Sequence, residues 1–297
     1  MFEKICRMTQ EELKKFTILE LSSTHHVIFG DGYVYAQGTF PVLLVAHLDT
    51  VHKEAPYEFI YDPTNKSYSS PQGIGGDDRC GVYMILEVIK KFNCSVLFCE
   101  DEEIGCVGAQ KFVNTELCQS LEFNYIIEFD RKGSTDAVFY DCDNPEFEDF
   151  ITKDYYKTAY GSFSDISYLA PALGCAAVNL SCGYYQAHTT DEYVVIATME
   201  KSIEEACKIL ERTTEKDIFD YIEADYSWYK NGDYDYYSCD EYYGKFCYLF
   251  EYVDMDGTTQ WCEVFANNNA EAIGKFCMKC PNTTYNDIID MCCDDSY

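Results

Sequence analysis

Histidine and carboxylate residues recur in this chain directly after segments that read as buried strands, or at the start of a helix. They stand in five segments: His47 and Asp49 after PVLLVA, Asp77 and Asp78 in GIGGDDRCGV, the acids 100–103 after SVLFC, Asp130 after YIIEF, and His188 in SCGYYQAHTTDEY. Imidazole and carboxylate groups are common zinc ligands. Two zinc ions about 3.5–4 Å apart need a carboxylate that bridges them. Two histidines and three acids from different segments can supply this set.

The elements that must position these residues alternate between strand and helix up to about residue 222, which predicts an α/β layer structure with a mainly parallel sheet. The predicted strands are 26–29, 33–36, 41–46, 59–61, 67–69, 95–99, 125–129, 137–140 and 175–180, and the predicted helices after the N-terminal one are 78–92, 107–113, 146–151 and 200–212. In such a sheet the ligand sites lie at the carboxyl ends of the strands. We therefore expect the five segments to meet at one edge.

Beyond this region the composition changes. Residues 223–244 are dominated by Tyr, Asp and Glu, which predicts an acidic linker. Residues 245–297 predict a small ββα appendage, with strands at 245–253 and 260–266 and a helix at 270–279. The expected organisation is a catalytic domain over 1–222, the linker over 223–244 and an α+β appendage over 245–297.

Charge and composition exclude several classes of function. The 52 acidic residues against 22 basic ones leave a formal net charge of −30, which disfavours nucleic acid and acidic membrane surfaces as partners. No segment is apolar enough to span a bilayer. The N-terminal MFEKICRMTQEELKKF reads as a charged amphipathic helix, unlike a signal peptide, so we expect a cytoplasmic protein. Its 17 cysteines then predict reduced, buried side chains.

Five motifs in order resemble the co-catalytic zinc exopeptidases, which include zinc aminopeptidases, peptidase-T-like tripeptidases and carboxypeptidase-G-like enzymes. The motifs are AHLDTV (46–51), GGDDRCGV (75–82), EDEEIGCVGA (100–109), EFDRKG (128–133) and AHTTDEYV (187–194). The resemblance covers roughly residues 40–200 and implies a three-layer zinc-exopeptidase fold. Lidded relatives insert a domain between the Asp and His ligands. Here that gap is 188 − 130 = 58 positions, which leaves no room for a lid.

The resemblance also implies a role for each motif residue. The first metal ion would be held by His47, Asp77 and Asp130, and the second by Asp77, Glu103 and His188, with Asp77 as the bridge. Asp49 would orient His47 from behind, and Glu102 would be the general base that takes a proton from the attacking water. The implied cofactors are two zinc ions, with cobalt or manganese as alternatives.

The function that follows is hydrolysis of a peptide bond, as an aminopeptidase or small-peptide exopeptidase. Two alternatives stay open. The same centre would serve a deacylase of N-acyl amino acids, and the fold would also suit a non-catalytic metal-binding protein that acts through its acidic appendage. Oligomeric state is not predicted.

Several residues also have plainer interpretations. The acids 100–103 could form a solvated turn, and Asp78 is either a partner behind the ligands or a helix N-cap. The GSFSD segment (161–165) is either a substrate or oxyanion loop or an ordinary turn. A separate zinc site formed by Cys277, Cys280, Cys292 and Cys293 is disfavoured by their spacing. His25, His26 and His52 are taken as ordinary surface or loop residues.

Overall fold

The computed structural model describes residues 1–161 and 163–224, together with residues 246–253, 259–266, 272, 275–276, 280 and 288–294. The chain divides into two compact units, of which the larger comprises Met1–Ala159 and Phe163–Ala224. From residue 225 onward the predicted acidic linker lies outside the described residues. The domain boundaries expected at residues 222 and 244 remain predictions.

The larger unit alternates helices and strands along the chain. Its helices are α1 (Phe2–Cys6), α2 (Gln10–Leu21), α3 (Gly76–Val88), α4 (Val107–Val113), α5 (Glu116–Gln119), α6 (Pro145–Thr152), α7 (Ile166–Leu173) and α8 (Ile196–Arg212). Its strands are β1 (His26–Gly30), β2 (Tyr33–Gln37), β3 (Phe40–His47), β4 (Ile60–Asp62), β5 (Ser67–Ser69), β6 (Cys94–Cys99), β7 (Tyr125–Arg131), β8 (Asp136–Val138), β9 (Lys157–Ala159), β10 (Ala177–Ser181), β11 (Tyr184–Tyr185) and β12 (Tyr193–Val195).

An eight-stranded sheet forms the centre of this unit, in the order β1-β2-β6-β3-β7-β10-β8-β9. The four central strands β6, β3, β7 and β10 are mutually parallel. Antiparallel pairs join β1 to β2, β2 to β6, and β8 to β10. The predicted α/β fold with a mainly parallel central sheet is confirmed, and the parallel part is the one that ends at the chemistry-bearing residues.

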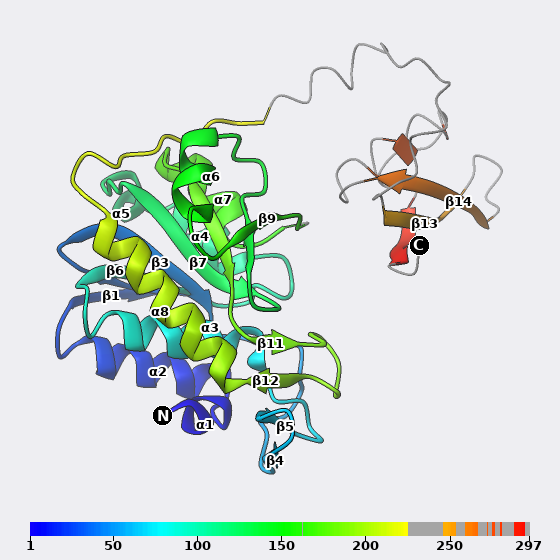
Figure 1. Cartoon of the computed structure of the whole chain (residues 1–297), viewed down its shortest axis with the longest axis horizontal. Helices are drawn as coiled ribbons and strands as arrows, with labels where there is room; N and C mark the ends of the chain where they lie inside the picture. The colour runs from blue at the N-terminus through cyan, green and yellow to red at the C-terminus, as the bar shows by residue number, and fades with distance from the viewer. Residues whose placement is uncertain are drawn as a thin grey trace. The chain divides into compact units, whose positions relative to one another are not determined.

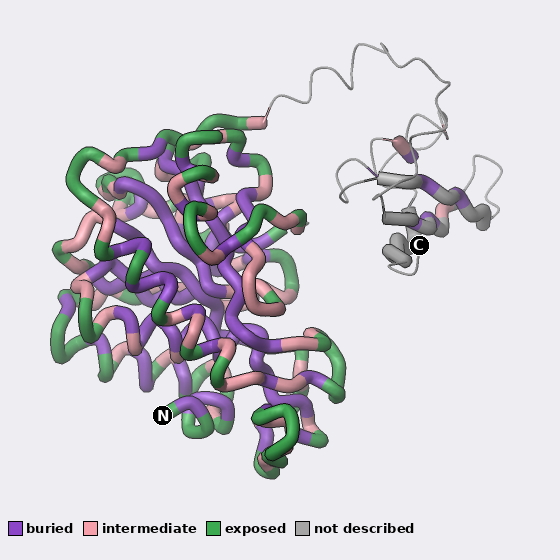
Figure 2. The backbone as a smooth tube through the Cα atoms, in the orientation of Figure 1, coloured by how far each residue is buried: buried purple, intermediate pink, exposed green. Residues whose placement is uncertain are grey.

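Helices cover both faces of this sheet (Figure 1). One hydrophobic cluster lies under α1, α2, α3 and α8, and a second lies under α4, α5 and α7. Strand β3 feeds both clusters, because Leu44 and Ala46 belong to the first and Leu43 and Val45 to the second. Figure 2 accordingly shows the central strands as buried. A strand covered on both faces explains why PVLLVA is continuously apolar.

Helix α3 approaches the sheet very closely at Gly81. A Cβ built on Gly81 would lie 1.9 Å from the main-chain oxygen of Phe129 on β7. No other residue type fits there, so this glycine of GGDDRCGV sets the distance between the helix and the strand. The same packing places the start of α3 beside the carboxyl end of β7.

A second, four-stranded antiparallel sheet has the order β11-β12-β5-β4. Its predicted hairpin is present as β4 and β5, whereas β11 and β12 were not predicted. The turn between β11 and β12 carries His188. This small sheet therefore brings a late segment of the chain beside the loop that precedes α3.

The described C-terminal residues form a three-stranded antiparallel sheet with the order β14-β13-β15. Its strands are β13 (Phe246–Val253), β14 (Thr259–Ala266) and β15 (Ile288–Asp294). The first two were predicted, but the expected ββα pattern missed β15. Within the expected helix 270–279, residues 272, 275 and 276 are described as helical.

The alternative zinc site formed by four cysteines lies largely outside the described residues. Cys292 and Cys293 lie on β15, while Cys277 lies outside the described residues, as do the side chains of Cys292 and Cys293.

Across the described part of the chain, no helix combines the length and apolar character needed to cross a membrane.

Candidate metal centre

The chemistry-bearing segments meet at the carboxyl edge of the parallel strands. Strand β3 ends at His47, the acids 100–103 follow β6, and Asp130 is the penultimate residue of β7. His47 and Cys99 are paired neighbours at the ends of β3 and β6. Asp77 lies at the start of α3, and His188 comes from the β11–β12 turn. The expectation that one edge gathers these residues is therefore met.

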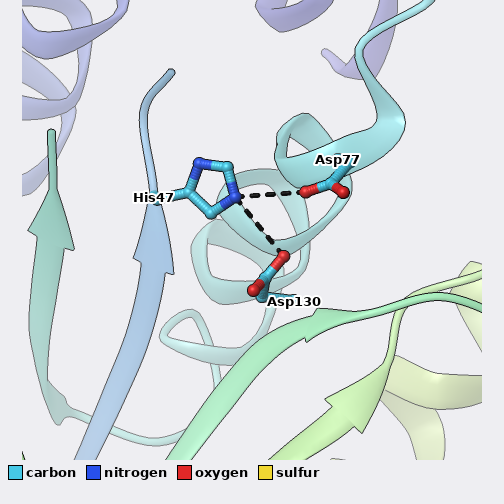
Figure 3. Close-up of side chains that lie close together, drawn as sticks. All are labelled: His47, Asp77 and Asp130. Atoms are coloured by element: carbon cyan, nitrogen blue, oxygen red, sulfur yellow. Dashed lines mark hydrogen bonds and ion pairs between the residues drawn. The ribbon is translucent and has the colours of Figure 1, made fainter. Parts of the chain in front are cut away.

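The first group of potential ligands consists of His47, Asp77 and Asp130. The Nε2 atom of His47 lies 3.1 Å from Asp77 Oδ1 and 3.4 Å from Asp130 Oδ1. Figure 3 shows both carboxylates directed at the same imidazole nitrogen. The His47 side chain is 1% exposed, so this group is held inside the protein.

The second group consists of Asp77, Glu103 and His188. His188 Nε2 lies 3.2 Å from Asp77 Oδ2 and 3.1 Å from Glu103 Oε2. Asp77 thus directs one carboxylate oxygen to each histidine. A carboxylate shared in this way is what two neighbouring cations require. The His188 side chain is 57% exposed, so the second group is far more open to solvent than the first.

The charge of the cluster fits divalent cations. Burial raises the pKa of Asp130 well above its usual range, and the nearby Asp77 raises it further. For Asp77, burial opposes ionisation, but hydrogen bonds from His188 and His47 overcome it and leave its pKa far below the usual range. Buried carboxylates crowded in this way are costly unless cations compensate them. The donor types and this crowding both suit a pair of zinc-like ions.

Asp49 supports two parts of the centre at once. Its Oδ1 lies 3.2 Å from His47 Nδ1, which leaves Nε2 of the imidazole for the ligand side. Its carboxylate also accepts hydrogen bonds from the main-chain N–H groups of Glu102, at 3.0 Å, and Glu103, at 3.1 Å. The predicted orienting residue therefore also anchors the loop that carries the predicted base.

Glu102 lies beside both groups but belongs to neither. Its Oε2 is 4.0 Å from His47 Nε2, and its Oε1 accepts a hydrogen bond from the Cys106 thiol at 3.4 Å. Burial raises the pKa of Glu102, and His47 partly offsets that rise. A raised carboxyl pKa suits a group that must take up and release a proton near neutral pH. The acids 100–103 are not a solvated turn.

Glu192 is a buried residue of the site that was not predicted. It is 0% exposed, and its carboxylate accepts hydrogen bonds from the main-chain N–H groups of Gly75 and Asp77, both at 2.9 Å. Its Oε2 also lies 3.0 Å from His52 Nε2. Glu192 thus ties the His188 segment to the Asp77 loop. His52 is a partner of this acid and not the ordinary loop residue that was expected.

Other histidines and Asp78 also take definite places. His25 is buried and contacts the main-chain oxygen of Cys94, so it is not a surface residue. Asp78 is 0% exposed. Its carboxylate accepts from the main-chain N–H of His47 at 3.3 Å and of Gly81 at 2.8 Å. Asp78 therefore supports both His47 and the first turn of α3, which unites its two alternative interpretations.

Asp165, in the GSFSD segment, is fully buried and is close enough to Glu102 to feel its charge. Among the described residues neither carboxylate oxygen has a hydrogen-bond partner of ordinary geometry, although the nearby Cys99 thiol favours its ionised form. Burial, together with Glu102, raises its pKa from 3.8 to about 7. The folded state therefore binds more protons than the unfolded chain between these two pH values. The metal-free protein should lose stability as pH rises through this window.

Replacing Asp165 with Asn removes this titration while keeping the side-chain shape. The metal-free Asp165→Asn protein should unfold at a higher temperature than the parent at pH 8, because an unpartnered buried charge is costly. At pH 5 the gain should be smaller, because Asp165 of the parent is then protonated. Thermal unfolding of both proteins at the two pH values measures this, and an equal gain at both would contradict the pKa assignment.

A model of a known family matches this part of the chain. The match is to "Peptidase family M28" and spans residues 34–172, which includes His47, Asp77, Glu103 and Asp130. No curated protein matches the chain significantly.

Several solved structures share the fold. Aminopeptidase PepT from Bacillus cereus is 14% identical, with a TM-score of 0.57 over 71% of this chain and 96% of that one. Aminopeptidase APDkam598 from the archaeon Desulfurococcus kamchatkensis is 14% identical, with a TM-score of 0.56 over 73% and 95%. A glutaminyl cyclase from Tannerella forsythia is 14% identical, with a TM-score of 0.51 over 72% and 96%. The predicted resemblance to zinc exopeptidases is confirmed, and the roles of the individual site residues remain predictions.

Proposed function

We propose that this chain, a metal-dependent peptidase of the zinc exopeptidase superfamily, removes residues from short peptides by means of two zinc ions. One observation carries the two-ion proposal: Asp77 directs Oδ1 to His47 and Oδ2 to His188, so the two ligand groups share one carboxylate. His47, Asp77 and Asp130 would hold the first ion, and Asp77, Glu103 and His188 the second. The donor set would also accept cobalt or manganese.

The residues around the two ligand groups have different roles in hydrolysis. When bound, the ions lower the pKa of water and polarise the peptide carbonyl. Glu102, which ligates neither ion, takes the proton from the attacking water and delivers it to the leaving amine. Asp49 keeps His47 in the required orientation and holds the main chain of Glu102 and Glu103. The chain's own groups thus position the reactants and move the proton.

The charge of the protein supports a substrate with a free amino group. The net charge of −30 attracts cationic substrates. Arg131, which follows Asp130, is paired with Asp136 at 3.2 Å and so is already engaged. An N-acyl amino acid is a net anion, whereas a short peptide with a free amino group is a zwitterion, so this acidic protein repels the first more than the second. We therefore place aminopeptidase activity ahead of deacylation.

A cytoplasmic location is part of the proposal. The ten cysteines of the larger unit, from Cys6 to Cys207, support it because none of them is in a disulfide.

The test compares matched substrates on the zinc-loaded protein. A short peptide with a free amino terminus, the same peptide N-acetylated, and an N-acyl amino acid are each incubated with the protein, before and after metal removal by a chelator. We expect hydrolysis of the free peptide alone, loss of activity on metal removal, and recovery on adding zinc. Cleavage of the N-acyl amino acid alone would favour the deacylase. A protein that binds zinc and cleaves none of them would favour the non-catalytic alternative.

A further inference from the structure

A second acid lies buried beneath Asp130 on the same face of β7. Side chains alternate along a strand, so Ile126, Glu128 and Asp130 point the same way. Ile126 contributes to the hydrophobic cluster on that face, and Glu128 is 1% exposed. Strand β7 lies between β3 and β10 in the middle of the sheet. Burying an acid at such a position destabilises the fold unless the acid is hydrogen-bonded. The hydrogen-bond partner of Glu128 therefore indicates its role.

That partner is Ser164, which also reaches the predicted ligand. Ser164 Oγ lies 2.6 Å from Glu128 Oε2 and 3.1 Å from Asp130 Oδ2. Ser164 is itself 1% exposed, so solvent does not compete for its hydroxyl. The serine therefore links the buried acid to the oxygen of Asp130 that does not face His47.

The number of hydrogens available to these three groups decides which of them donates in each hydrogen bond. A serine hydroxyl has one hydrogen to donate and two lone pairs to accept with. It cannot donate to both carboxyl groups, so one of the two contacts requires a proton on the carboxyl. A carboxylate must be ionised to ligate a metal ion, so with Asp130 as the ligand that proton lies on Glu128. Glu128 then donates to Ser164, and Ser164 donates to Asp130.

Two further hydrogen bonds hold the main chain of Asp130. Its main-chain N–H donates to Asn179 Oδ1 at 2.9 Å, and its main-chain oxygen accepts from the Tyr184 hydroxyl at 3.0 Å. The Ser164 contact is the closest hydrogen bond to the carboxylate itself, since the Tyr184 hydroxyl is 3.4 Å from Oδ1. Without Ser164 the carboxylate would be free to rotate away from His47.

We propose that Glu128 and Ser164 form a positioning pair that holds the Asp130 carboxylate in place to bind the first metal ion. The inference rests on the proposed two-metal function. It assigns roles to two residues that ligate nothing and touch no substrate. Replacing such outer partners costs roughly 10–100-fold in metal affinity or activity.

The test measures zinc affinity by competition with a chelator, alongside thermal unfolding of the metal-free proteins. Ser164→Ala and Glu128→Leu should each weaken the more tightly bound zinc ion by about 10–100-fold. Glu128→Gln should stay close to the parent, because its amide N–H can still donate to Ser164. Ser202→Ala is the matched control, since Ser202 is a buried serine whose hydroxyl has no partner in the described part of the chain.

The outcomes separate this inference from a structural role and from the proposed function. A structural role would lower the unfolding temperature of metal-free Ser164→Ala and leave zinc affinity unchanged, which would overturn the inference alone. Loss of affinity in Glu128→Gln equal to that in Glu128→Leu would also overturn it. If the parent itself held no zinc, the proposed function would fail first. Weaker zinc binding in Ser164→Ala and Glu128→Leu, with metal-free stability unchanged and Glu128→Gln rescued, supports the pair.

Discussion

The Glu102→Gln protein should retain both zinc ions and lose about 10²–10⁴-fold in kcat, which is the usual contribution of a general base. Glutamine keeps the shape of the side chain but cannot accept the proton from water. Glu102 lies 4.0 Å from His47 Nε2 and belongs to neither ligand group. Removing its charge should therefore leave both groups intact, and the change should appear in kcat rather than in KM.

The measurement pairs steady-state kinetics with elemental analysis of the same preparations. Glu116→Gln is the matched control, because Glu116 is an exposed glutamate on α5 and should change neither quantity. Activity equal to the parent would remove Glu102 as the base. Loss of one metal ion together with activity would instead make Glu102 a ligand, and the assignment of Glu102 and Glu103 would have to be exchanged.

The sequence predicts the fold and the candidate site best where a run of buried apolar residues leads directly into residues that can ligate a metal ion. PVLLVA and SVLFC are continuously apolar because β3 and β6 are covered on both faces, and each leads directly into site residues. The elements that escaped prediction lack such a pattern. Helix α7 is short and contains Pro171, and a proline within a helix argues against one. Strand β15 has the sequence IIDMCCD, which does not alternate regularly.

Supporting residues escaped prediction for a different reason. Glu192 stands within the AHTTDEYV motif, yet nothing in its neighbours shows that its carboxylate accepts main-chain hydrogen bonds from residues more than a hundred positions away. Glu128 resembles any acid near a strand end until its burial is known. Ser164 was considered only as part of GSFSD, which was expected to be a substrate or oxyanion loop or an ordinary turn, whereas its hydroxyl points inward to Asp130. Ser162 of the same segment lies outside the described residues. The motifs predict which residues ligate the metal ions, whereas the residues that hold those side chains in place are found only from tertiary contacts.

The two ligand groups differ in exposure, and metal removal should follow that difference. His47 is 1% exposed and its Nδ1 is fixed by Asp49, whereas His188 is 57% exposed and lies on a turn. An ion in the second group can lose a ligand to solvent without opening the core. Graded chelation should therefore remove about one ion per chain first, with loss of activity, and the other only at higher chelator concentration.

Single variants should reproduce these two steps. His188→Ala should retain about one zinc ion, held in the buried group, because Asp77 can still serve His47 and Asp130. His47→Ala removes the ligand at the centre of the buried group and leaves Asp49, Asp77 and Asp130 without their shared partner. We expect it to lose the tight ion and also to unfold at a lower temperature when metal-free, since buried carboxylates left without a cation are destabilising. Both variants should weaken binding at the affected group by more than the roughly 10–100-fold typical of outer partners.

His26→Ala is the matched control, because His26 is an exposed histidine on β1 that joins neither group. Zinc per chain is measured by elemental analysis after dialysis, and affinity by chelator competition. Two ions lost together in His188→Ala would mean that the groups are not separable, and the bridging role of Asp77 would then dominate the energetics of both. Two ions retained in His188→Ala would instead exclude His188 as a ligand, because its exposed imidazole would be a neighbour of Asp77 and Glu103 without binding metal.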